Sequence, residues 1–331
     1  MTTIIDIAKI AGVSKSTVSR VVSNSGFVKF ETREKIERVM KELNYTPNLF
    51  AKGMRTSKSY SIGILFPEFS NPYFAEWYEI VDRIARQEGY MNYICITDTK
   101  GESEEKRLDD LLARNIDGII LFSYCKRNDF VDKLLKVSVN TPVICSDSMF
   151  EDTGLSCVFA DGELGTFDAV TYLLNSGRKR IAYIKGEKPY TVVERRYKGY
   201  CKALSEYGLS IEEGLVFAGN FKKESGFQAA KRFMGMANPP DAIVASTDDM
   251  AVGALEYLVK NGYDVPAQIA VMGFNNQQIS THTSPTLSTV SLPIKELAET
   301  AINTLVRLIG SPKKQPIKHI FSCELEIRES T

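Results

Sequence analysis

The sequence predicts a small all-α N-terminal domain followed by a larger α/β body made of two doubly wound lobes. Short helical patterns of apolar residues fill positions 1–46, and a stretch containing Pro and Gly follows them. From residue 60 onward, strand-like apolar runs alternate with amphipathic helices. With 331 residues, of which 44% are hydrophobic and 25% charged, the chain has the composition of a globular protein with more than one domain.

Charge is distributed unevenly along the chain. The whole sequence is formally neutral, with 41 basic and 41 acidic residues. Residues 1–60 hold seven Lys and four Arg against one Asp and four Glu, a balance of +6 that residues 61–331 offset. A basic head on an acidic body is expected when one segment alone contacts a polyanion such as nucleic acid.

Several classes of protein are disfavoured. The longest apolar runs, such as 119–122, are too short to span a membrane, and the N-terminus lacks the pattern of a secretory signal. Six scattered Cys without a Cys-x-x-Cys pair favour reduced thiols in a cytoplasmic protein over a disulfide framework. The two His have no ligand-like neighbours, and no Gly-x-Gly-x-x-Gly or Walker loop follows a strand, so we expect neither metal nor cofactor.

The head is predicted to contain three short helices. Apolar residues at i, i+3, i+4 and i+7 define the first over 4–11, and Gly12 ends it. Ser14 can cap the second helix, which buries Val18 and Val21. The third begins at about Glu31. Two helices joined by a tight turn form a helix-turn-helix pattern, whose second helix enters the major groove of DNA.

The exposed side of the second helix carries Lys15, Ser16, Thr17 and Arg20. From spacing alone, a solvated three-helix bundle with surface cations is the alternative to DNA binding. Residues 49–55 could form one short helix after Asn48, which would be marginal alone and would fold on binding. A plain linker without a helix is equally compatible with the sequence of residues 49–55.

The run from Asp6 to Val22, continued by 32–33 and 43–48, resembles the signature of the LacI/GalR family of bacterial transcription regulators. The resemblance extends over essentially the whole chain. It implies a dimeric repressor that reads two operator half-sites and inserts an apolar wedge into the minor groove, where Met54 stands in place of the usual Leu. The DNA-binding residues expected from pattern and resemblance together are Thr3, Ser14, Lys15, Ser16, Thr17, Ser19, Arg20, Asn24, Asn48, Ala51 and Met54.

The body is predicted to alternate strands with helices in two halves that part near residues 157–161. Expected strands are 61–66, 91–97, 118–122, 143–146, 180–185, 215–218, 242–245 and 269–273. Expected helices are 73–88, 103–114, 129–136, 193–207, 224–236 and 248–260. Such halves form two Rossmann-like lobes that close on a ligand, as in periplasmic binding proteins.

With the family resemblance, the expected domains are the helix-turn-helix head, 1–46, and the hinge helix and linker, 47–59. The N-terminal lobe is expected at 60–160 plus about 291–322, and the C-terminal lobe at 161–290 plus about 323–331.

Polar and aromatic residues at strand ends predict an effector pocket, because ligands of open α/β sheets bind beyond the carboxyl ends of the strands. The expected residues, from strand ends or from the resemblance, are Asn71, Tyr73, Asp98, Ser123, Asp147, Arg196, Phe221, Thr247 and Asn275. Each has a structural alternative: Asp98 or Asp147 could cap a turn, Phe221 could belong to the core, and Arg196 could pair across the lobes.

These residue types suit a polyhydroxylated ligand, a sugar or sugar derivative. Two positions depart from the family pattern, which commonly has Asn at the position of Thr247 and Asp at that of Asn275. Loss of that carboxylate favours a phosphorylated or acidic sugar, although an ordinary glycan fits as well.

Three functions are compatible with such a body: a ligand-responsive regulator, a solute-binding protein and an enzyme. The basic head and the lack of a signal sequence disfavour a solute-binding protein. The sequence shows no catalytic Ser/His/Asp or Cys/His set, so we expect no enzymatic activity. The favoured interpretation is a cytoplasmic, homodimeric repressor of carbohydrate genes that binds a palindromic operator under the control of a small effector.

Overall fold

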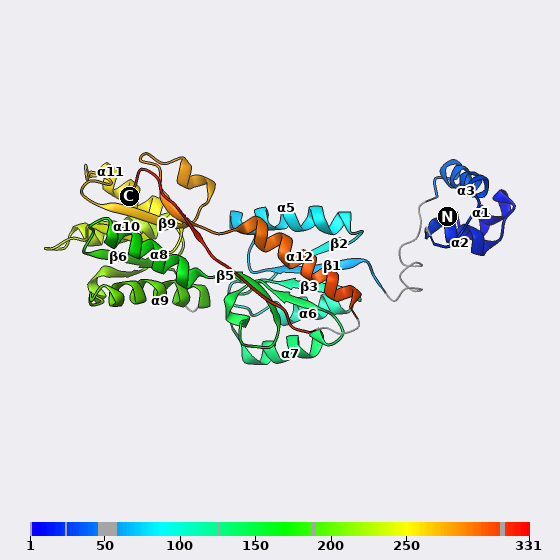
Figure 1. The fold of residues 1–331 in the computed structure, drawn as a ribbon, viewed down its shortest axis with the longest axis horizontal. Helices are drawn as coiled ribbons and strands as arrows, with labels where there is room; N and C mark the ends of the chain where they lie inside the picture. The colour runs from blue at the N-terminus through cyan, green and yellow to red at the C-terminus, as the bar shows by residue number, and fades with distance from the viewer. Residues whose placement is uncertain (1, 24, 46–57, 125, 187–189, 312–314) are drawn as a thin grey trace. The chain divides into compact units, whose positions relative to one another are not determined.

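The computed structural model describes residues 2–23, 25–45, 58–124, 126–186, 190–311 and 315–331. The chain divides into two compact units, residues 1–60 and residues 61–331. Figure 1 colours the ribbon from blue at the N-terminus to red at the C-terminus, so the elements of each unit can be followed in sequence order.

The first unit contains three helices, α1 (Ile4–Ala11), α2 (Lys15–Val22) and α3 (Phe30–Glu42). Thr3 and Asp6 form a reciprocal capping box at the start of α1, and Gly12 ends it with a left-handed φ of 63°. Ser14 caps α2 by accepting a hydrogen bond from the Thr17 amide at 3.1 Å. The fully buried Ile7, Val18 and Ile36 join the three helices in one apolar core.

The first lobe of the second unit is built on the sheet β11-β5-β4-β3-β1-β2, in which all strands are parallel. Its strands are β1 (Ser61–Phe66), β2 (Met91–Ile96), β3 (Gly118–Leu121), β4 (Val143–Cys145), β5 (Ser156–Ala160) and β11 (Lys318–Phe321). Its helices are α5 (Pro72–Gln87), α6 (Glu104–Leu112), α7 (Asn128–Ser138), η1 (Ser148–Phe150) and α12 (Ile294–Gly310).

The second lobe repeats this design with the sheet β12-β10-β9-β8-β6-β7, in which only the pairing of β12 with β10 is antiparallel. Its strands are β6 (Ile181–Lys185), β7 (Val216–Ala218), β8 (Ala242–Ala245), β9 (Ala270–Asn275), β10 (Ser288–Ser291) and β12 (Glu324–Glu326). Its helices are α8 (Gly162–Asn175), α9 (Thr191–Glu206), η2 (Glu213–Leu215), α10 (Lys223–Met234), α11 (Asp248–Lys260) and η3 (Gln278–Thr281).

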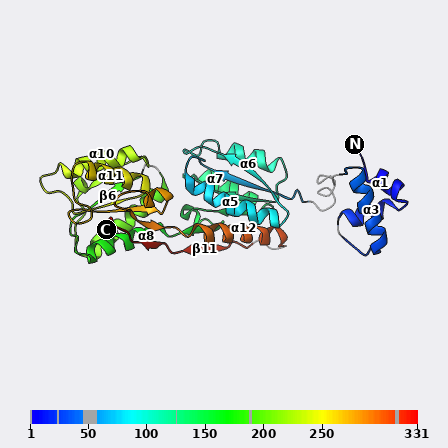
Figure 2. The same cartoon turned by 90° about the horizontal axis from the view of Figure 1, so that it is seen from above.

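Both sheets are covered by helices on their two faces, which is why their central strands are continuously apolar. Along β1, Ile62, Ile64 and Phe66 pack with α5 and α12 on one face, whereas Leu65 packs with α6 and α7 on the other. Figure 2 shows α12 lying beside α5. The corresponding layers of the second lobe are α10 with α11 and α8 with α9.

The chain passes between the lobes three times, at 160–162, 291–294 and 321–324, where a strand of one sheet leads to an element of the other lobe. These connections explain why both sheets contain strands from distant parts of the sequence. Every strand and helix expected in the body is present within a few residues of its expected bounds. The sequence patterns did not, however, indicate α8, α12, β5 or β10–β12, all of which help to complete the two lobes.

Candidate functional site

The described part of the head presents a polar surface at the start of α2. Lys15, Ser16 and Arg20 are exposed, whereas Val18 and Val21 on the opposite side are buried. This separation leaves the N-terminal turns of α2 open to an external partner. Ser16 and Thr17 lie close to Ser14, with oxygen–oxygen distances of 2.7 and 2.8 Å.

Other residues predicted to bind DNA have structural contacts of their own. Thr3 and Ser14 are helix caps, and Ser19 lies half-buried in α2. A cap at a helix N-terminus also orients the first-turn amides, so capping and phosphate binding are compatible. Asn24, Asn48, Ala51 and Met54, together with the predicted hinge helix, lie outside the described residues.

A cavity of about 860 Å³ lies between the two lobes of the body. It is lined by segments that follow β1, β3 and β4 of the first sheet and by the corresponding strand ends of the second. Parallel strands bring these carboxyl ends to one edge of each sheet, and the two edges face the same space. Eight of the nine residues predicted for the pocket line it: Asn71, Tyr73, Ser123, Asp147, Arg196, Phe221, Thr247 and Asn275.

Asp98 is the exception, because it is not part of the described cavity lining. Its carboxylate accepts hydrogen bonds from the backbone amides of Lys100, Glu102 and Ser103 at 2.6–2.9 Å. These bonds outweigh the partial burial of the carboxylate and lower the pKa of Asp98 to about 2. Asp98 therefore shapes the loop before α6. This is the structural role, capping a turn, that the sequence left open as the alternative to a ligand contact.

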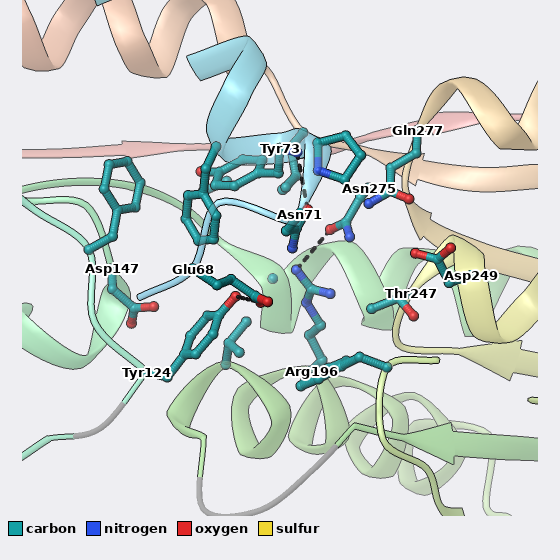
Figure 3. A pocket seen from close by; sticks show the side chains of 18 of the residues that line it. Glu68, Asn71, Tyr73, Tyr124, Asp147, Arg196, Thr247, Asp249, Asn275 and Gln277 are labelled. Carbon is teal, nitrogen blue, oxygen red and sulfur yellow. Dashed lines mark hydrogen bonds between the residues drawn. The ribbon is translucent and has the colours of Figure 1, made fainter. Parts of the chain in front are cut away.

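Arg196 of α9 is the most deeply buried cation of the cavity, with 8% of its surface exposed. Its guanidinium lies 3.6 Å from the centre of the Phe274 ring and donates to the Ser246 carbonyl and, at 3.1 Å, to Asn275 Oδ1. Figure 3 shows the guanidinium directed toward Asn71 and Asn275. Burial lowers the pKa of Arg196, because the charged form loses hydration.

Phe221 and Asn275 adopt backbone conformations with φ of 64° and 112°, which non-glycine residues rarely adopt. Gly186 makes room for the Phe221 ring, since a Cβ at position 186 would lie 2.1 Å from Phe221 Cε1. Strained residues persist where the surrounding structure holds them, and they are frequent at ligand sites. In these conformations both side chains line the cavity.

Two carboxyl groups, those of the half-buried Asp147 and the buried Asp248, lie at or beneath the cavity. Burial raises the pKa of Asp147 to about 6, although the carboxylate accepts a bond from the Met149 amide at 2.8 Å. Burial likewise raises the pKa of Asp248 to about 6. Asp248 accepts from Thr289 Oγ1 at 2.5 Å and from the Gln277 amide at 2.7 Å, so its contacts are structural.

The cavity also contains residues that the sequence prediction missed. Tyr124 donates to Glu68 Oε1 at 2.9 Å (Figure 3). Its ring also contacts Tyr190, with ring centres 4.7 Å apart. Tyr190 in turn stacks on Phe221 at 5.8 Å. Glu68 and Tyr124 follow β1 and β3 by a few residues, so a wider window at each strand end would have found them.

Direct contacts join the lobes beside the cavity. Tyr124 belongs to the first lobe and Tyr190 to the second, so their ring contact crosses the cleft. Arg195 of α9 pairs with Glu151 of the first lobe at 2.7 Å, and Lys318 of β11 binds the same carboxylate at 3.0 Å. These bonds lower the pKa of Glu151. Any change in the lobe arrangement must alter them.

Two further properties bear on the kind of site. Among the described residues, no group of three or more His, Cys, Asp or Glu side chains could hold a metal ion. No helix in the described part of the chain is long and apolar enough to cross a membrane.

Comparison with known proteins gives matches in both units. Residues 3–48 match a family described as bacterial regulatory proteins, lacI family, and residues 170–331 match a periplasmic binding protein-like domain. A Bacillus subtilis protein named "Probable HTH-type transcriptional repressor ExuR" is 33% identical, with 100% of this chain and 98% of that protein aligned. Catabolite control protein A of Priestia megaterium is 31% identical, with 99% of each chain aligned.

Among solved structures, the lac repressor dimer bound to operator and the anti-inducer ONPF is similar over 99% of this chain and 98% of that chain. Its TM-score is 0.88 at 26% identity. A complex of the transcriptional regulator CelR with cellobiose covers 100% of both chains, with a TM-score of 0.74 at 28% identity.

Proposed function

Because the chain belongs to the LacI family of bacterial transcription regulators, we propose that it represses carbohydrate genes by binding a palindromic operator as a homodimer. A small effector in the interlobe cavity modulates this binding. The observation that carries the proposal is the combination, in one chain, of an exposed basic α2 with a cavity between two hinged lobes. The regulator acts in the cytoplasm, where bacterial operator DNA lies.

Base recognition is assigned to the first two turns of α2. Lys15 and Arg20 are exposed there, beside the hydroxyls of Ser16 and Thr17. An Arg that contacts guanine O6 and N7 contributes about 1–3 kcal/mol of discrimination against a wrong base. One such helix reads only a few base pairs, so useful specificity requires two copies on two half-sites.

The exposed edge of the first sheet supports a dimer contact in the body. Strand β2 stands at the end of the described sheet and exposes Met91, Tyr93 and Ile94, at 62%, 40% and 40% of their surfaces. An exposed apolar edge strand invites pairing with another chain. We assign this edge to the interface between two copies.

The effector is expected to act through the lobe arrangement. A ligand shifts an equilibrium between two conformations only by binding one of them more tightly. The contacts of Tyr124 with Tyr190 and of Glu151 with Arg195 cross the cleft next to the cavity. A ligand that draws the lobes together or apart therefore changes the body geometry on which the spacing of the two heads depends.

A selection experiment tests the proposal. The intact chain is incubated with a library of randomised DNA duplexes, and the bound duplexes are sequenced over successive rounds. Enrichment of one imperfect palindrome, protected over both half-sites, is the expected result. Arg20→Ala is expected to relax the preference at one symmetric base pair per half-site. Enrichment of no sequence, or binding by a strictly monomeric chain to an asymmetric site, would refute the function proposed here.

A further inference from the structure

Arg196 has a positive charge without a counter-ion in the part of the chain that the structure describes. No carboxylate oxygen of the described residues lies within 4.0 Å of its nitrogens, although Arg195 beside it is paired with Glu151. Its two recorded acceptors, the Ser246 carbonyl and Asn275 Oδ1, are neutral, and Nε is buried without an acceptor. An unpaired charge with 8% exposure is costly, and an anion bound beside it would lower that cost.

The acidic groups around the cavity have other hydrogen-bond partners or are disfavoured as charged groups by burial. Glu68 accepts the hydroxyl of Tyr124, Asp147 caps η1, and Asp248 accepts from Thr289 and Gln277. The remaining lining carboxyl, Asp249, has its pKa raised by burial. Asp147 and Asp248 act on Arg196 from beyond 4.0 Å, and none of these groups forms an ion pair with it among the described residues, so its N–H groups remain available to a ligand.

The neighbours of Arg196 add donors rather than acceptors. A guanidinium only donates, so the Asn275 atom that it contacts at 3.1 Å is the carbonyl oxygen, and the amide NH₂ of Asn275 is left for another partner. Asn71 Oδ1 likewise accepts from the Tyr73 amide at 3.1 Å, and its NH₂ has two N–H groups, of which one is directed to the Tyr124 hydroxyl and the other is left. Figure 3 shows both amides next to the guanidinium at the centre of the cavity.

We propose that the effector is an anionic sugar, whose carboxylate or phosphate binds the Arg196 guanidinium and the amide groups of Asn71 and Asn275. This inference rests on the proposed function. The anion supplies the missing counter-ion and accepts from three side chains that present N–H groups. The polyhydroxylated part of the ligand lies against the Phe221 and Tyr124 rings, and the volume of about 860 Å³ accommodates it.

Isothermal titration calorimetry with the intact chain tests the charge requirement. The probes are D-glucuronate, D-galacturonate, glucose 6-phosphate and galactose 6-phosphate, each compared with its neutral parent, D-glucose or D-galactose, at constant ionic strength. At least one acid is expected to bind about tenfold or more tightly than its neutral parent. Comparing the two uronates with the two sugar phosphates shows whether the bound anion is a carboxylate or a phosphate.

The variant Asn275→Asp supplies the missing counter-ion from the protein. It keeps the shape of the side chain and the oxygen that accepts from Arg196, so folding is preserved. We expect it to weaken binding of the acid at least about tenfold while leaving the neutral parent unaffected or improved. Asn115→Asp is the matched control, because Asn115 also has a positive φ but is exposed and lies outside the cavity lining.

Several results would overturn the proposal. They are equal or tighter binding of a neutral sugar, no binding by any of the four acids, and an equal loss of acid binding in Asn275→Asp and Asn115→Asp. Circular dichroism and melting temperature confirm that both variants are folded. Because the operator selection is performed without sugar, its outcome separates failure of this inference from failure of the proposed function.

Discussion

Gly199→Ala tests how helix packing positions Arg196. Gly199 lies one turn after Arg196 in α9, where α9 packs on α8. A Cβ at position 199 would lie 2.1 Å from the Glu163 carbonyl oxygen and 2.9 Å from the Phe167 amide. The contacting atoms belong to the backbone and cannot rotate away. The two helices must therefore separate by roughly 1.3 Å or more to reach an ordinary contact distance of about 3.4 Å.

The expected loss of stability in Gly199→Ala follows from overpacking between the two helices. Adding one methyl group to a well-packed interface destabilises a protein by about 1–3 kcal/mol. For a body of this size, that loss lowers the melting temperature by about 2–5 °C. The same displacement moves the Arg196 guanidinium away from Asn275, so any sugar that stabilises the wild-type chain is expected to stabilise the variant less.

Gly310→Ala is the matched control, because a Cβ at the end of α12 would meet no atom within 4 Å. It is expected to be neutral or slightly stabilising, since Ala favours a helix more than Gly does. Calorimetry at a fixed protein concentration gives both melting temperatures. If Gly199→Ala melts at the same temperature as Gly310→Ala, α9 tolerates the shift and the packing argument is wrong.

Three further predictions concern charged groups. Arg20→Ala is expected to lower discrimination at one operator base pair by about 1–3 kcal/mol; an equal loss on operator and random DNA, measured by fluorescence anisotropy, would make Arg20 a phosphate contact. Because the pKa of Asp147 is raised from 3.8 to about 6, its ionisation opposes folding as the pH rises through that range. Asp147→Asn should therefore gain stability over wild type by about 1–3 kcal/mol between pH 4 and pH 7, as read from urea titrations; an unchanged difference would contradict this burial. Glu151→Gln is expected to lower the free energy of unfolding, because the ion pairs of Glu151 stabilise its charged form in the folded protein and lower its pKa. It should cost about 1 kcal/mol at pH 7 and progressively less below about pH 4.5, and a pH-independent difference would show that the pairs contribute nothing.

The sequence alone determined the local features of this protein. The three head helices, the Ser14 cap and the turn at Gly12 depend on residues only a few positions apart, so periodicity and capping chemistry indicate them directly. The strand ends that carry Asn71, Ser123, Asp147 and Thr247 could also be predicted, because parallel sheets gather their carboxyl ends at one edge.

Local patterns failed where two roles share one residue type or where the buried face of a helix is not marked by large apolar residues. An Asp after a strand fits a ligand contact or a turn, and only the three amide bonds to Asp98 decide between them. The buried residues of helix α8 lie on one face, but that face includes Gly165 and Thr166, and the apolar Leu164 is exposed outside it. Its sequence therefore lacks the one-sided apolar pattern that reveals a surface helix.

The tertiary structure decided the chemistry of the cavity. Arg196 meets the Ser246 carbonyl and the Asn275 amide across 50 and 79 residues of sequence, and no spacing rule connects those positions. The sequence shows which side chains lie at strand ends, but burial and partners determine their charges and free donors. The unpaired guanidinium of Arg196 and the raised pKa of Asp147 arise because folding removes water from groups that are separate along the chain.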